Sequence, residues 1–191
     1  MSTRRKMLAA DEEIANRVVE MAQKRGQTVF QTVNDILEQA LRVDGMGLTL
    51  TDVVNERGML EKAKQMGLTF TIENLLYDVV ELAHSNAEKN LTDLWLETGK
   101  WYGKYFTQKS DNGLDAFRAA MDLLTIGNSV YNIELEKDGV VLISYVSERF
   151  NSGYIEDCGK FIEGVFDSFD MELLEKENSK GVIRMKFTPS K

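Results

Sequence analysis

The stretch RRKMLAADEEIANRVVEMAQKRGQTVFQTVNDILEQALRVD, residues 4–44, opens the chain, and the interpretation of the rest depends on it. We predict a short strand over residues 4–10 and two helices after it. Asp11 is a suitable N-cap for the first helix, Gly26 a suitable end, and Thr28 a suitable start for the second. Apolar residues recur at helical spacing in both segments. They are Ile14, Val18, Met21 and Ala22, then Val29, Val33, Ile36, Leu37, Ala40 and Leu41.

These two apolar stripes need a partner, because so short a segment cannot bury both of them alone. The simplest partner is a second copy of the same chain, since most oligomers are symmetric assemblies of identical subunits. We therefore expect a homodimer or a higher even oligomer.

The order of strand, capped helix, turn and second helix resembles the ribbon-helix-helix family of prokaryotic DNA-binding proteins. The turn Gly26-Gln27-Thr28 matches the Gly-x-Ser/Thr turn of that family. The resemblance implies that two copies pair their strands and insert the ribbon into the major groove of double-stranded DNA. It also implies that the second helix directs its N-terminal amides at a phosphate. The DNA-binding residues implied are Arg4, Arg5, Lys6, Met7, Ala9, Lys24, Arg25, Thr28 and Val29, with Arg5 as the expected base contact.

The same segment also fits a helical hairpin that only dimerises. Residues 4–44 hold seven basic and seven acidic side chains, whereas a DNA-binding head is usually basic. The net charge of the whole chain is −8, so the acidic excess lies beyond residue 44. An acidic body repels nucleic acid. Any DNA binding would therefore belong to the N-terminal segment.

Length and composition indicate a folded protein with a small head and a larger body. The chain has 191 residues, with 43% hydrophobic and 28% charged residues. We expect a DNA-binding or dimerisation domain over residues 1–44, a connecting helical segment over 45–67 and an α+β domain over 68–191. The single cysteine excludes an internal disulfide and fits a reducing compartment. No apolar run of membrane-spanning length and no signal peptide is present, so we expect a soluble, cytoplasmic protein without a membrane partner.

The C-terminal third changes from helical to alternating patterns. Residues 129–135 and 140–146 read as a hairpin around Lys137-Asp138-Gly139, and residues 171–177 and 182–187 read as a second hairpin. A helix over residues 154–169 lies between them. The order β-β-α-β-β has no parallel crossover. It predicts an α+β fold in which helices pack on a four-stranded antiparallel sheet.

This order resembles the V4R domain, a small-molecule-binding module related to the Bet3 subunits of vesicle-tethering complexes. The segment Cys158-Gly159-Lys160-Phe161-Ile162-Glu163-Gly164-Val165 is similar to the helix after the first hairpin in that family. The helix with Gly99 and Gly103 is similar to its glycine-containing helix before the sheet. The four-residue spacing of these glycines also lets another backbone pack closely along that edge of the helix. The resemblance implies an apolar cavity between helices and sheet. The residues expected to line it are Trp95, Tyr102, Phe106, Cys158 and Phe161.

Catalytic and metal chemistry has little support. His84 is the sole histidine, and we interpret it as a residue near a helix C-terminus, where the helix dipole favours it. Cys158 lies on an apolar helix face, as a small core residue does. No phosphate-binding glycine motif and no zinc-ligand set occurs. We therefore expect no enzyme activity, no cofactor and no metal.

Three functions remain at this point. The first is a dimeric DNA-binding transcriptional regulator whose C-terminal domain senses an apolar small molecule or stabilises the dimer. The second is an interaction or scaffold protein, dimerised by its N-terminal arm, that does not bind DNA. The third is an enzyme or heme sensor that depends on His84. We rank them in that order.

Overall fold

Contacts within the chain divide it into two units, Met1–Lys62 and Ala63–Lys191. The computed structural model describes residues 6–69, 71–124 and 129–190. From the sequence we expected three segments, residues 1–44, 45–67 and 68–191. Each unit is described by itself below.

The N-terminal unit consists of helices with local caps. Its helices are α1 (Glu12–Arg25), α2 (Val29–Asp44) and the greater part of α3 (Leu50–Gln65). The Asp11 carboxylate accepts a hydrogen bond from the Glu13 amide at 2.9 Å, and the Thr28 hydroxyl accepts one from the Gln31 amide at 3.2 Å. Gly26 ends α1 with a left-handed φ of 65°, which glycine adopts without steric cost. The predicted caps of both helices are confirmed.

The prediction of an N-terminal β-ribbon is wrong for the residues that the structure describes. Arg4 and Arg5 lie outside the described residues, and residues 6–11 form no strand. The physical reason is that a strand needs a neighbour to satisfy its amides and carbonyls, and the described sheet contains only the four C-terminal strands. The apolar stripes of α1 and α2 also stay largely uncovered, because only Ala22 and Thr32 are buried in these helices. A second copy that covers them remains a prediction.

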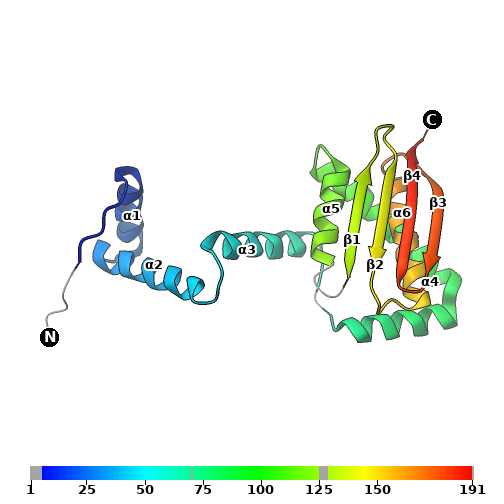
Figure 1. Ribbon diagram of the computed structural model, residues 1–191, viewed down its shortest axis with the longest axis horizontal. Helices are drawn as coiled ribbons and strands as arrows, with labels where there is room; N and C mark the ends of the chain where they lie inside the picture. Colours follow the sequence, from blue (N-terminus) through cyan, green and yellow to red (C-terminus); the bar gives the residue numbers. More distant parts are fainter. Residues whose placement is uncertain (1–5, 70, 125–128, 191) are drawn as a thin grey trace. The chain divides into compact units, whose positions relative to one another are not determined.

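The C-terminal unit is an α+β layer, as predicted (Figure 1). Its elements are α4 (Glu73–Lys109), α5 (Gly113–Leu124), β1 (Val130–Leu135), β2 (Val141–Val146), α6 (Ser152–Asp167), β3 (Met171–Ser179) and β4 (Val182–Pro189). The sheet is antiparallel throughout, with strand order β1-β2-β4-β3. The order β-β-α-β-β and the four-stranded antiparallel sheet are confirmed.

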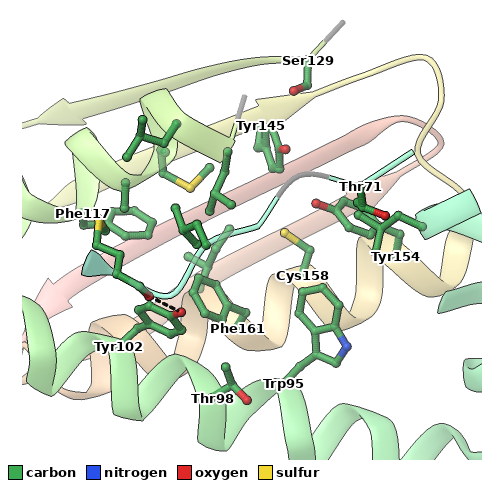
Figure 2. Close-up of a pocket in the computed structure, with 18 of the residues that line it drawn as sticks. Thr71, Trp95, Thr98, Tyr102, Phe117, Ser129, Tyr145, Tyr154, Cys158 and Phe161 are labelled. Carbon is green, nitrogen blue, oxygen red and sulfur yellow. Dashed lines mark hydrogen bonds between the residues drawn. The ribbon is translucent and has the colours of Figure 1, made fainter. Parts of the chain in front are cut away.

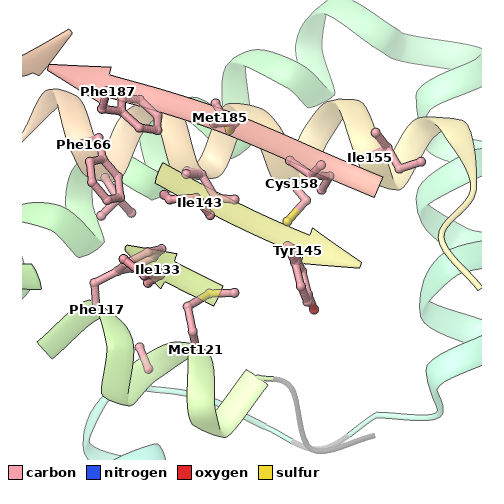
Figure 3. Close-up of a cluster of buried hydrophobic side chains, with 14 of the residues drawn as sticks. Phe117, Met121, Ile133, Ile143, Tyr145, Ile155, Cys158, Phe166, Met185 and Phe187 are labelled. Atoms are coloured by element: carbon pink, nitrogen blue, oxygen red, sulfur yellow. The ribbon is translucent and has the colours of Figure 1, made fainter. Parts of the chain in front are cut away.

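The core lies between one face of the sheet and the helices (Figure 3). Ile143 and Tyr145 of β2 point into it, as do Met185 and Phe187 of β4, while their neighbours along each strand alternate to the other face. Phe166 of α6 stacks on Phe187 with ring centroids 4.4 Å apart. The helices and the sheet therefore share one continuous apolar interior.

Helices α4 and α6 approach each other closely through glycine. A side chain at Gly99 of α4 would meet the Phe161 carbonyl of α6, and one at Gly103 would meet Ser168 and the Val165 carbonyl. Gly164 of α6 faces the backbone of α4 in the same way. The close approach expected from the spacing of Gly99 and Gly103 is confirmed, and it fixes the position of α6 against α4.

Helix α4 is broken at Ala87, whose φ of −150° and ψ of 42° are not helical. The buried carboxylate of Asp157 in α6 contacts both sides of the break. Its Oδ2 lies 3.1 Å from Nδ1 of His84, and its Oδ1 lies 3.1 Å from the Thr92 hydroxyl. Asp157 thus joins the two segments of α4 to α6. No helix among the described residues is long and apolar enough to cross a bilayer.

Candidate functional site

The C-terminal unit contains a cavity of about 480 Å³. It lies between α4, α5, α6 and β2, with residues of the segment before α4 as a further wall (Figure 2). Its size falls within the range of about 300–1,000 Å³ that is usual for small-molecule pockets. The five residues expected to line a cavity all line this one: Trp95, Tyr102, Phe106, Cys158 and Phe161.

One end of the cavity is aromatic. We call Tyr102, Phe106, Phe117 and Phe161 the aromatic end. Their rings pack against one another, with Tyr102 and Phe161 at a centroid distance of 5.9 Å and Phe106 and Phe117 at 6.2 Å. The Tyr102 hydroxyl donates a hydrogen bond to the Met66 carbonyl at 2.8 Å, which holds the wall before α4 in place (Figure 2). The only strong polar group at this end is therefore already occupied.

The opposite side carries hydroxyl groups. We call Thr71, Ser129, Tyr145 and Tyr154 the hydroxyl end, and Figure 2 shows them on the other side of the cavity from Tyr102 and Phe117. Burial raises the pKa of Tyr145, and it raises the pKa of Tyr154 well above its usual value. Both phenols are therefore neutral at physiological pH and can each donate and accept a hydrogen bond.

Glu73 is the only acidic or basic residue among the described residues that line the cavity. Its Oε2 lies 2.7 Å from the Arg149 guanidinium, and its Oε1 accepts a hydrogen bond from the Tyr77 hydroxyl at 3.3 Å. Burial is the main cause that raises the pKa of Tyr77, with Tyr145 and Glu73 as further causes. The charge of Glu73 is therefore matched by protein groups.

Cys158 is buried in the cavity wall, and burial raises the pKa of its thiol from 9.0 to about 12. A thiol is nucleophilic as the thiolate, so this group is poorly reactive in the folded chain.

We expect a thiol reagent such as 5,5′-dithiobis(2-nitrobenzoate) to label the native protein at pH 8 at least tenfold more slowly than the urea-unfolded protein. Equal labelling rates would contradict the buried position. Because the folded pKa is the higher one, the stability that the thiol contributes is present below pH 9 and decreases as the pH rises toward 12.

His84 does not line the cavity, so the idea of a heme ligand needs revision. The residue lies just before the break at Ala87, near the end of the first segment of α4 as expected, and its ring is bound to Asp157. The described cavity wall contains no histidine, and its one thiol is protonated. The residues present therefore do not fit a heme held by histidine or thiolate. Among the described residues, no three His, Cys, Asp or Glu side chains come together as a metal site.

The predicted DNA contacts lie elsewhere, in the N-terminal unit. Lys6, Met7 and Ala9 belong to the irregular segment before α1. Lys24 and Arg25 end α1, and Thr28 and Val29 begin α2. All seven side chains are exposed, and the described structure forms them into no strand surface that could enter a groove.

Comparison with known proteins gives one match. No protein-family model and no curated protein matches the chain. A solved structure described as "Probing the function of heme distortion in the H-NOX family" is similar at 18% identity and a TM-score of 0.38, over 72% of this chain and 86% of that chain. The similarity is too distant to carry a fold family or a ligand to this protein.

The prediction of a DNA-binding transcriptional regulator is therefore wrong. The described N-terminus is helical and has no ribbon. No family match supports a ribbon-helix-helix head. The cavity of the C-terminal unit becomes the candidate site.

Proposed function

We propose that the C-terminal unit is a binding module for an apolar small molecule. The observation that carries the proposal is a cavity of about 480 Å³ with an aromatic end, a hydroxyl end and one neutralised charge, built within a single unit. Ligand pockets usually combine apolar walls with a few polar groups that orient the ligand. Among the described residues of the wall, the thiol of Cys158 is protonated and the carboxylate of Glu73 is paired with Arg149.

The driving force is the transfer of apolar surface out of water. Burial of apolar area contributes about 25 cal/mol per Å². The wall is held by contacts that do not depend on a ligand, such as the hydrogen bond from Tyr102 to Met66 and the ring packing of Trp95 against Tyr154 and Phe161. A preformed wall reduces the ordering cost of binding.

The test fills the cavity from one wall. Ala120 of α5 lines the cavity, so the added atoms of Ala120→Leu extend into it. We expect this variant to bind the neutral probe N-phenyl-1-naphthylamine at least tenfold more weakly than the parent protein. The readout is energy transfer from Trp95, in a Trp101→Phe background that leaves Trp95 as the sole tryptophan.

The matched control is Ala119→Leu, one residue earlier on the same helix and outside the cavity wall. It should bind the probe like the parent. If the parent protein does not bind the probe, or if both variants weaken binding equally, the cavity is not a binding site for apolar molecules.

A further inference from the structure

Polarity is separated along the cavity wall. Hydroxyl groups of Tyr145, Tyr154, Ser129 and Thr71 gather at one end, while the opposite end presents aromatic rings (Figure 2). The Thr98 hydroxyl, which lies on the side of Tyr102, already donates to the Leu94 carbonyl at 2.7 Å. The buried Tyr145 and Tyr154, which are 3% and 9% exposed as residues, hydrogen-bond to each other, and Tyr145 also bonds to Ser129. A hydroxyl has one proton and two acceptor lone pairs, so this cluster keeps hydrogen-bonding capacity that a ligand without polar groups cannot use. The wall is therefore matched to a molecule with one polar terminus.

The charges on the wall decide what kind of terminus fits. An anionic head group would enter a buried region whose described lining includes no lysine, arginine or histidine. The guanidinium of Arg149 is bound to the cavity-lining Glu73 at 2.7 Å. A buried anion without a cation is strongly disfavoured, and the hydroxyls of Tyr145 and Tyr154 are already shared with each other and with Ser129. A carboxylate or phosphate at this end therefore lacks a counter-ion.

A cationic head group meets a different obstacle. The only carboxylate in the described wall, Glu73, already has Arg149 and the Tyr77 hydroxyl as partners. An ammonium group would have to displace Arg149 from it. Neutral phenols and hydroxyls, in contrast, need only a group that donates and accepts hydrogen bonds.

We propose that the ligand is an uncharged amphiphile, whose hydroxyl or similar neutral polar group binds at the hydroxyl end and whose apolar body extends to the aromatic end. The proposal rests on the proposed function and adds the ligand's chemical class to it. Tyr145 and Tyr154 are the residues that set this specificity. The raised pKa values of both phenols agree with it, because a neutral phenol retains its donor.

The experiment compares three eight-carbon molecules that differ in the polar head group: 1-octanol, octanoate and octylammonium. Each is titrated at pH 7.5 against the full chain loaded with N-phenyl-1-naphthylamine, and displacement is followed through Trp95. We expect 1-octanol to displace the probe at a concentration at least tenfold lower than octanoate and octylammonium.

A pair of tyrosine variants separates head-group recognition from simple hydrophobicity. Tyr145→Phe removes one hydroxyl of the hydroxyl end and should narrow the preference for 1-octanol over octanoate to about threefold or less. Tyr105→Phe is the matched control, because the Tyr105 hydroxyl contacts the Gln65 carbonyl and does not line the cavity. It should keep the full preference. Tyr154→Phe removes the other phenol hydroxyl at the same end and should narrow the preference to the same extent. It tests the inference if Tyr145→Phe folds poorly.

The outcomes separate this inference from the proposed function. If the probe binds and the three heads displace it equally, or if octanoate is the strongest, the cavity binds apolar molecules but the inferred ligand class is wrong. If Tyr145→Phe and Tyr105→Phe retain the same preference for 1-octanol over octanoate, the hydroxyl end does not recognise the head group. If the probe does not bind at all, the proposed function itself falls.

Discussion

Gly164→Ala is expected to destabilise the C-terminal unit by about 2 kcal/mol or more, although alanine is the better helix former. A Cβ at this position would lie 2.2 Å from the Leu96 carbonyl oxygen and 2.8 Å from the Lys100 amide nitrogen. Both are backbone atoms of α4, so no side chain can rotate away. The two helices must separate to admit one methyl group, and the separation opens contacts along their whole interface.

The magnitude follows from two opposing effects. Overpacking of a well-packed interior costs about 1–3 kcal/mol and at times more. Alanine in a helix interior recovers up to about 1 kcal/mol relative to glycine. The overpacking effect should dominate here because the obstacle at Gly164 is backbone on a neighbouring helix.

Gly159→Ala is the matched control on the same helix. A Cβ there would meet the end of the Lys176 side chain at 3.3 Å and the Asn178 side-chain amide at 3.7 Å, and no backbone atom within these contacts, so the change should be neutral or slightly stabilising. Both tryptophans lie in the C-terminal unit, so urea unfolding followed by their fluorescence reports this unit alone. Equal midpoints for the two variants would show that α4 and α6 are not packed through Gly164.

The C-terminal fold could be predicted because local signals and long-range pairing agree there. Alternation along residues 140–146 and the turn at Gly139 define a hairpin, and the structure pairs Val141 with Leu135 across it. The spacing of Gly99 and Gly103 likewise indicated a close helix contact. It could not indicate that α6 was the partner, since spacing on one helix carries no information about the other.

The N-terminal prediction failed for the complementary reason. The caps at Asp11, Gly26 and Thr28 are local, and they are confirmed. A strand over residues 4–10 depends on a pairing partner that a sequence pattern cannot supply. The described residues of that segment remain irregular, and the function inferred from a ribbon was wrong with it.

The candidate site was found in part. Aromatic residues on one helix pointed to a cavity wall, and Trp95, Tyr102 and Phe106 line the cavity. The hydroxyl end was missed, although a signal was present. Alternation along β2 puts Tyr145 on the same face as the buried Val141 and Ile143, so its phenol could have been expected in the protein interior. That Tyr154 would meet it could not be known before α6 was placed against the sheet.

His84 shows most clearly what sequence spacing could not reveal. The contact joins residues 84 and 157, which no local pattern relates. It also adds a second role to this residue near the end of a helix segment, because His84 is the partner of a fully buried carboxyl group. His84→Ala is accordingly expected to destabilise the C-terminal unit by about 1–3 kcal/mol, because removal of one partner leaves a buried carboxyl group with one hydrogen bond fewer.

The expected size depends on what Asp157 retains in the variant. Its other contact is the Thr92 hydroxyl at 3.1 Å, and that hydroxyl also lies 2.8 Å from the Glu88 carbonyl. A hydroxyl has one proton, so Thr92 cannot donate fully to both oxygens. His84 is therefore the principal donor to Asp157. Thr92→Val should consequently destabilise the unit much less than His84→Ala does.

A double-mutant cycle tests whether the pair acts as a unit. Asp157→Asn removes the charge but keeps the shape, and combined with His84→Ala it leaves no buried ion to compensate. The double variant should be more stable than the sum of the two single effects predicts, by about 0.5–3 kcal/mol in urea unfolding. Additive effects would mean that His84 contributes packing alone. A coupling of this size would mean that Asp157 fixes the break in α4, because the carboxylate reaches His84 before Ala87 and Thr92 after it.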